Sequence, residues 1–268
     1  MAEQMNALNP GQVRLWQQRE RILKNLSTAR HKIAVMSGKG GVGKTTVCVN
    51  LAVLTAENAA VGLVDCDIDC PNVNAFLGIN DRLLVEGEKT ILPAEKYGLK
   101  AVSMAGLQET PDTAIMWRGP LIANMLAQFL ENTRFGELDF LFFDTPPGTS
   151  DAALSLVQNA GLSGTIIVST PQKVALSDAL KTVRMCQQLH VPILGLVENM
   201  SGEVFGKGSL QKMAEKEGLA FLGSVKLDRK NAELAEQGIP SVSKNPSVRK
   251  EFEKILENMK KTLESAKS

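Results

Sequence analysis

Short apolar runs alternate with longer amphipathic segments along most of the chain. One short run is Phe140-Leu141-Phe142-Phe143, which contains no polar side chain. A continuous run of this kind is typical of a strand that is covered on both faces. The pattern therefore predicts an α/β fold: a single-domain, mostly parallel sheet flanked by helices.

The same pattern places the elements along the chain. We expect strands over Lys32–Ser37, Val61–Asp65, Leu99–Met104, Asp139–Asp144, Thr165–Ser169, Ile193–Glu198 and Ala220–Ser224. We expect helices over Lys44–Ala56, Pro120–Asn132, Ser150–Ala160, Val174–Leu189, Ser209–Glu217, Arg229–Gln237 and Ser247–Ser265. No internal repeat or low-complexity tract interrupts this order, so residues 31–268 are predicted to form one domain.

Residues 1–30 are expected to form an N-terminal extension with an amphipathic helix. Within 11–28, Val13, Trp16, Ile22 and Leu26 recur at helical spacing among basic residues. We expect this helix to dock on the main domain or on a partner, and a role at a membrane surface is the alternative. The last helix is also amphipathic, but its glutamates favour packing over membrane binding.

Composition narrows the classes of partner. The 268 residues include 30 Lys and Arg and 29 Asp and Glu, a formal net charge of +1. Near-neutral charge argues against a broad electrostatic field, so we expect no nucleic acid partner. No signal peptide is apparent and no apolar run reaches the ~18 residues of a membrane span, so we expect no stable membrane insertion. The four cysteines include no C-x-x-C pair, which favours a reducing, cytoplasmic location.

The most specific motif is Gly38-Lys39-Gly40-Gly41-Val42-Gly43-Lys44-Thr45, which matches the phosphate-loop pattern G-x-x-x-x-G-K-[ST]. It follows a predicted strand and opens a predicted helix, as the motif requires. Glycines at 38, 40, 41 and 43 let backbone N–H groups, including that of Val42, face phosphate oxygens. We expect Lys44 to contact the β- and γ-phosphates of ATP, Thr45 to bind Mg²⁺ and Thr46 to hydrogen-bond a phosphate.

Acidic residues follow at two strand ends, where ligands of open α/β sheets bind. Asp144 is expected to hold Mg²⁺ through water, and the turn at residues 145–148 is expected to sense the γ-phosphate. In an extended segment Asp65, Asp67 and Asp69 would share one face. We expect Asp67 to orient the attacking water and Asp69 to be a solvated strand end.

The extra lysine, Lys39, makes this loop resemble the deviant Walker A loop of the P-loop NTPases in the ParA/MinD/nitrogenase-iron-protein class. The resemblance implies a homodimer that sandwiches its nucleotides. It also implies a catalytic role for Lys39, which would cross the interface to the phosphates bound by the partner. Positive charge delivered where charge develops is the logic of an arginine finger.

A narrower resemblance covers about residues 31–262. The motifs Trp117-Arg118-Gly119-Pro120, Asp144-Thr145-Pro146-Pro147-Gly148-Thr149-Ser150-Asp151, Thr170-Pro171-Gln172 and Glu198-Asn199-Met200-Ser201 resemble the Mrp/ApbC family of iron–sulfur cluster carrier ATPases. The resemblance implies ATP hydrolysis and cluster transfer to target apoproteins. It also implies that Asn199 recognises adenine and that the backbone around 226–228 closes over the base.

The chain departs from that family at the cluster site. Members usually carry a C-x-x-C shortly after Asn-Met-Ser, and a dimer joins two such pairs around one cluster, but residues 202–208 contain no cysteine. Cys66 and Cys70 are the alternative ligands in a dimer, whereas Cys48 and Cys186 are interpreted as packing residues. Two hypotheses follow: a cluster carrier or partner of a cluster-bearing relative, and a MinD/ParA-like nucleotide switch or adaptor that binds no cluster.

Overall fold

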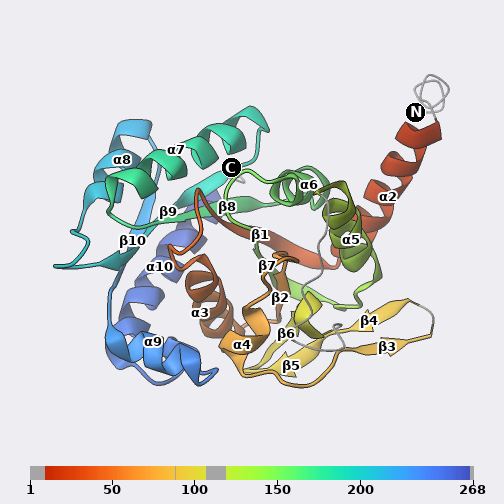
Figure 1. The fold of residues 1–268 in the computed structure, drawn as a ribbon, viewed down its shortest axis with the longest axis horizontal. Helices are drawn as coiled ribbons and strands as arrows, with labels where there is room; N and C mark the ends of the chain where they lie inside the picture. The colour runs from red at the N-terminus through yellow and green to blue at the C-terminus, as the bar shows by residue number, and fades with distance from the viewer. Residues whose placement is uncertain (1–9, 88, 107–118, 266–268) are drawn as a thin grey trace.

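The computed structural model describes residues 10–87, 89–106 and 119–265 (Figure 1). Its strands are β1 (Ala29–Ser37), β2 (Val61–Asp65), β3 (Leu84–Glu86), β4 (Thr90–Leu92), β5 (Ala94–Lys96), β6 (Leu99–Val102), β7 (Leu138–Asp144), β8 (Gly164–Ser169), β9 (Ile193–Ser201) and β10 (Phe221–Lys226). Its helices are α2 (Pro10–Leu26), α3 (Lys44–Ala56), α4 (Val73–Leu77), α5 (Gly119–Asn132), α6 (Asp151–Asn159), α7 (Lys173–Gln188), α8 (Ser209–Glu217), α9 (Arg229–Glu236) and α10 (Pro246–Ser265), with short 3-10 helices η1 (Met104–Gly106) and η2 (Ser241–Ser243).

The main sheet has eight strands in the order β10-β9-β8-β1-β7-β2-β6-β5. Neighbouring strands are parallel except β5, which pairs antiparallel with β6. The fold class predicted from the sequence is confirmed. Because β1 lies between β7 and β8, the loop after β1 emerges beside the ends of both strands.

Alternating side chains of the central strands pack into two layers. On β1, Ile33 and Val35 join a core with α3, α4 and α10, whereas Ala34 and Met36 join a core with α2, α5 and α6. Figure 1 shows these helix groups on opposite sides of the sheet. Burial on both faces explains the continuous apolar runs within the central strands, such as Ile33–Met36 in β1 and Phe140–Phe143 in β7.

The structure contains every predicted strand and helix, with ends that differ by a few residues. The strand expected over 99–104 ends at Val102 because the chain turns into η1. The sequence pattern did not predict α4, β3, β4 or β5, which are only three to five residues long.

The N-terminal helix α2 packs on the main body. Ile22 and Leu26 are buried, and the side-chain amide of Asn25 donates to the carbonyls of Leu130 and Thr133 at 2.7 and 2.8 Å. Toward its N-terminal end Leu15 is largely exposed, and in Figure 1 that end projects from the body. Among the described helices, none is long and apolar enough to cross a membrane.

Candidate functional site

The phosphate loop connects β1 with α3, which begins at Lys44. Gly41 and Gly43 have φ angles of 78° and 79°, in the left-handed region that glycine adopts without a steric penalty. Gly38 is required for a different reason: a Cβ atom there would lie 2.1 Å from the backbone carbonyl carbon of Asp178 in α7. The loop thus turns tightly onto the N-terminus of α3, where backbone N–H groups and the helix dipole favour an anion.

Three of the predicted side chains meet at the end of this loop. The Lys44 ammonium lies 2.6 Å from Oδ1 of Asp144, and Thr45 Oγ1 donates a 2.6 Å hydrogen bond to Oδ2 of the same carboxylate. Lys44 and Asp144 are both buried. Burial by itself lowers the pKa of Lys44, but the charge and hydrogen bond of Asp144 outweigh it and raise the pKa, so Lys44 stays charged.

The acidic residues after β2 have different surroundings. Asp65 is buried, Asp67 is half-buried and Asp69 is exposed. The expectation that the three share one face assumed an extended segment, but the strand ends at Asp65 and the chain bends at residues 68–70. Burial raises the pKa of Asp65 to about 7 and also raises the pKa of Asp67. Asp65 stands beside Asp144 in the pairing of β2 with β7.

Asp67 faces the turn that was expected to sense a γ-phosphate. Asp67, Pro146 and Pro147 line one cavity of about 580 Å³. The backbone N–H of Gly148 donates to the carbonyl of Ser37 at 2.8 Å, which ties this turn to β1. The hydroxyl of Ser37 in turn donates to the carbonyl of Lys39 at 3.0 Å. The structure therefore gathers the phosphate loop, Asp67 and the turn at one end of the sheet.

Asn199 lies against the phosphate loop although 157 residues separate it from Val42. Its side chain is buried, and its amide donates a 2.9 Å hydrogen bond to the carbonyl of Val42. A Cβ atom on Gly43 would lie 2.1 Å from the amide nitrogen of Asn199. Glycine at 43 therefore serves both the loop conformation and the close approach of Asn199.

Beside Asn199 is a cavity of about 270 Å³. Thr46 and residues 226–228 line it, as does Met200, which has a φ of 56°. Further residues line this cavity that no sequence motif indicated, because they come from separate elements with ordinary helical or strand patterns. They are Phe76, Val225, Asn231, Ala232, Ala235, Glu236, Ser241 and Phe252.

The segment that lacks the expected cysteines forms a small hairpin. The N–H of Gly202 donates to the carbonyl of Gly206 at 2.9 Å, and the N–H of Gly206 donates to the carbonyl of Gly202 at 2.8 Å. Val204 at its tip is 73% exposed. Below it, the buried Glu198 carboxylate accepts the N–H groups of Gly208 and Leu210 and so holds the start of α8. The hairpin is thus closed by its own backbone hydrogen bonds and contains no cysteine.

The four cysteines differ in their exposure, although Cys66 and Cys70 line the same cavity as Asp67. Cys48, Cys66 and Cys186 are buried and only Cys70 is exposed. Burial raises the pKa of the Cys66 thiol, which donates to the carbonyl of Val64 at 3.8 Å. Within residues 10–87, 89–106 and 119–265, no group of three or more His, Cys, Asp or Glu side chains is arranged to hold a metal ion.

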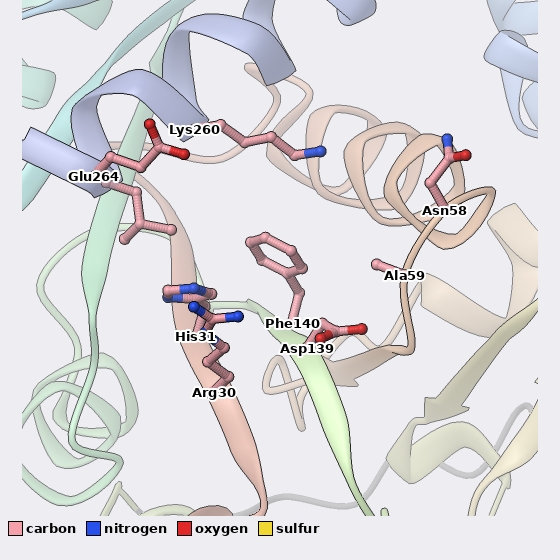
Figure 2. Close-up of a pocket in the computed structure, with 9 residues that line it drawn as sticks. Arg30, His31, Asn58, Ala59, Asp139, Phe140, Lys260 and Glu264 are labelled. Carbon is pink, nitrogen blue, oxygen red and sulfur yellow. The ribbon is translucent and has the colours of Figure 1, made fainter.

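A further cavity of about 330 Å³ lies at the opposite end of the sheet (Figure 2). The rings of His31 and Phe140, at the amino ends of β1 and β7, lie 5.1 Å apart between centroids. Lining residues of both charges, including Arg30 and Lys260 against Asp139 and Glu264, surround it. Ligands of open α/β sheets bind at the carboxyl ends of the strands, so we assign this cavity no part in the site.

A glycine-rich loop between a central strand and a helix, with Lys44, Thr45 and Asp144 in contact at its end, defines a P-loop nucleotide-binding protein of the α/β class. The sequence matches the family described as ParA, NUBPL iron-transfer P-loop NTPase, over residues 28–263. The chain belongs to this family, which confirms the resemblance found in its motifs.

Named relatives agree with this assignment. The iron-sulfur cluster carrier protein of Methanocaldococcus jannaschii is 40% identical over 266 residues, which cover 94% of this chain and 92% of that protein. The mitochondrial iron-sulfur protein required for NADH dehydrogenase of Arabidopsis thaliana is 41% identical and is covered over 78% of its length, against 86% of this chain.

Solved structures share the fold. A nucleotide-binding protein from Archaeoglobus fulgidus in complex with ADP superposes with a TM-score of 0.72 at 33% identity, covering 83% of this chain and 92% of that one. The cell division ATPase MinD of Pyrococcus furiosus gives 0.68 at 23% identity, with coverage of 87% and 99%, which shows a common fold alone.

Proposed function

We propose that this chain is a cytoplasmic, homodimeric ATPase that acts in iron–sulfur cluster assembly or in transfer of clusters to target apoproteins. One observation carries the ATPase proposal: Lys44, Thr45 and Asp144 are joined by contacts of 2.6 Å at the end of the phosphate loop. The family and the relatives named as cluster carriers support the wider role.

The residues suit a magnesium nucleotide. The hydroxyl of Thr45 and the carboxylate of Asp144 are hard oxygen donors, which Mg²⁺ prefers, and they already lie together. When bound, Mg²⁺ would neutralise charge on the phosphates. Lys44 exchanges Asp144 for phosphate oxygens, and the backbone of 38–43 with Thr46 completes the phosphate contacts. Asn199 and the cavity beside it take the adenine.

Hydrolysis uses two further residues. Asp67 orients the attacking water from the cavity that it shares with the turn at 146–147. Lys39 of the partner subunit supplies positive charge as the γ-phosphate leaves, which lowers the barrier without taking part in covalent chemistry. Lys44→Ala is expected to abolish nucleotide binding, measured by calorimetry with ATP and Mg²⁺. Wild-type affinity in that variant would contradict the proposed phosphate site.

A second candidate function, a nucleotide switch or adaptor, is supported by the hairpin at 202–206. The hairpin at 202–206 is closed by its own hydrogen bonds and contains no cysteine. This favours a MinD/ParA-like nucleotide switch or adaptor that binds no cluster. Both functions need ATP, so cluster binding separates them.

Anaerobic reconstitution with ferrous iron and sulfide makes that separation. The protein is desalted, and its visible absorbance and bound iron are compared with those of Cys66→Ala/Cys70→Ala, with Cys186→Ala as the matched control because that thiol is buried in packing. Bound iron that is lost only in the double variant supports a carrier. Equal, negligible iron in all three proteins contradicts the carrier function and favours the adaptor.

A further inference from the structure

Asp65 is a buried carboxylate that joins three separate segments. Its Oδ2 accepts the backbone N–H of Val73 and the hydroxyl of Ser103, each at 3.0 Å. Its Oδ1 accepts the backbone N–H of Asp67 at 3.1 Å. Val73 is the first residue of α4, and Ser103 follows β6, which pairs with β2 (Figure 1). The end of β2, the start of α4 and the end of β6 are thus held by one side chain.

The segment between Asp65 and Val73 contains neither helix nor strand. At its start, the N–H of Cys66 continues the sheet by donating to the carbonyl of Asp144 at 2.8 Å. The next contact is the bond from Asp67 N–H to Asp65. The carboxylate of Asp67 then accepts the N–H of Cys70 at 3.3 Å. Asp67 is therefore held at two points: its backbone N–H by the Asp65 carboxylate, and its own carboxylate by the N–H of Cys70.

We propose that Asp65 is a positioning residue for ATP hydrolysis, which holds Asp67 in the orientation that directs the attacking water. This inference rests on the proposed function, because it assigns Asp65 no role except through Asp67. The chemistry explains why a carboxylate is needed. In its ionised form the Asp65 carboxylate offers two acceptor oxygens, whereas the asparagine amide offers one and presents N–H groups in place of the other. We call the three hydrogen bonds that Asp65 accepts the Asp65 clamp. In Asp65→Asn, the N–H groups of the new amide would point at an N–H donor on one side of this clamp.

Three variants divide the clamp. Asp65→Asn is expected to lower kcat at least about tenfold while the Kd for ATP stays within about threefold of wild type. Ser103→Ala removes one of the three hydrogen bonds and should lower kcat by less. Asp69→Asn is the matched control, because this carboxylate is exposed in the same segment and should leave both constants unchanged.

A double variant separates positioning from a general structural role. If Asp65 acts through Asp67, then Asp65→Asn/Asp67→Asn should have the same residual kcat as Asp67→Asn alone. A further fall of about tenfold in the double variant would overturn the proposal. So would a folded Asp65→Asn variant with wild-type kcat. Should Asp65→Asn fail to fold, an unchanged kcat in Ser103→Ala would overturn the proposal instead.

Hydrogen exchange tests the clamp without hydrolysis. In the nucleotide-free protein, amides of residues 66–73 should exchange faster in Asp65→Asn than in wild type, while those of β1 and β7 stay unchanged. If the wild type does not hydrolyse ATP, the proposed function fails and the exchange result still decides whether the clamp exists. Unchanged exchange over 66–73 overturns it.

Discussion

At the scale of single residues, Asp144 is the group that Lys44 and Thr45 both contact. Its carboxylate forms an ion pair with Lys44 and accepts a hydrogen bond from the hydroxyl of Thr45, and both Lys44 and Asp144 are buried. Removing one member of a buried ion pair leaves the other charge without compensation. Loss of either partner alone should therefore destabilise the fold as well as alter the phosphate site.

We expect Asp144→Ala to lower the free energy of unfolding by about 3 kcal/mol, because the Lys44 ammonium is then buried alone. Urea denaturation without nucleotide measures this. The control is Lys44→Met/Asp144→Ala, which removes both charges and should recover part of the loss. A single variant within about 1 kcal/mol of wild type would show that Lys44 finds another partner or reaches water.

Gly38 and Gly40 differ in the space that their surroundings leave for a side chain. An added Cβ at Gly38 meets the backbone of Asp178, whereas one at Gly40 meets nothing within 4 Å. Gly38→Ala should therefore destabilise the fold by about 2 kcal/mol or more, and Gly40→Ala by less than about 0.5 kcal/mol. Thermal unfolding of the nucleotide-free variants checks this, and equal melting temperatures would contradict the close contact with α7.

The sequence predicted that Lys44, Thr45 and Asp144 serve one magnesium–nucleotide site, because ligands of open α/β sheets bind at strand ends beside the phosphate loop, but their direct contacts come only from the structure. Motif spacing did not predict that Asp65 would be buried while Asp67 is half-buried and Asp69 is exposed. That outcome depends on Ser103 and Val73, which become hydrogen-bond donors only when β6 and α4 are in place.

At the scale of elements, the long apolar strands and amphipathic helices were predictable because burial on both sheet faces leaves a strong pattern. The missed strands β3 and β5 are short and mostly exposed, and β4 has only one buried residue, so they leave no such pattern. Their positions come from pairing with neighbours, such as β5 with β6, which single-segment periodicity does not contain.

The end of α3 is joined to α10 by a two-point ion pair. Arg249 donates to both carboxylate oxygens of Glu57, at 2.7 and 2.6 Å, and the hydrogen bond from Arg249 lowers the pKa of Glu57. A lowered folded pKa means that the stabilisation is present above the unfolded pKa, and is lost as pH falls through the folded value. The side chains are partly exposed, so the contribution is modest.

We expect Glu57→Gln to cost up to about 1 kcal/mol at neutral pH and less in acid, where the wild-type carboxylate is itself protonated. Urea midpoints of both proteins at neutral pH and below the pKa of Glu57 measure the difference. Glu257→Gln, which removes a pair within α10 only, is the control. A Glu57→Gln effect that grows as pH falls would contradict the assigned sign.

At the scale of the whole molecule, strand order brings the site together. The ends of β1, β7 and β2 are neighbours in the sheet, although the corresponding residues are spread from Gly38 to Asp144 along the chain. The alternation of strands and helices predicts a parallel sheet but not this order. The sequence pattern likewise did not predict the backbone hydrogen bonds that close the hairpin at 202–206.

We propose that Lys39 of the partner subunit completes the active site of this ATPase. We expect Lys39→Ala to bind ATP as wild type does but to lose turnover, and Asp67→Ala to form a dimer with ATP and Mg²⁺ by light scattering. In a mixed dimer of these two inactive variants, one site regains both an intact Asp67 and an intact Lys39 from the other chain.

Mixing Lys39→Ala with Asp67→Ala, followed by measurement of phosphate release, is the most direct test. With random pairing, half the dimers are mixed and one of their two sites is complete, so activity should return to about a quarter of wild type. Each variant alone, at the same total concentration, is the control. A mixture no more active than either variant would contradict the account, because Lys39 would then act within its own chain or not at all.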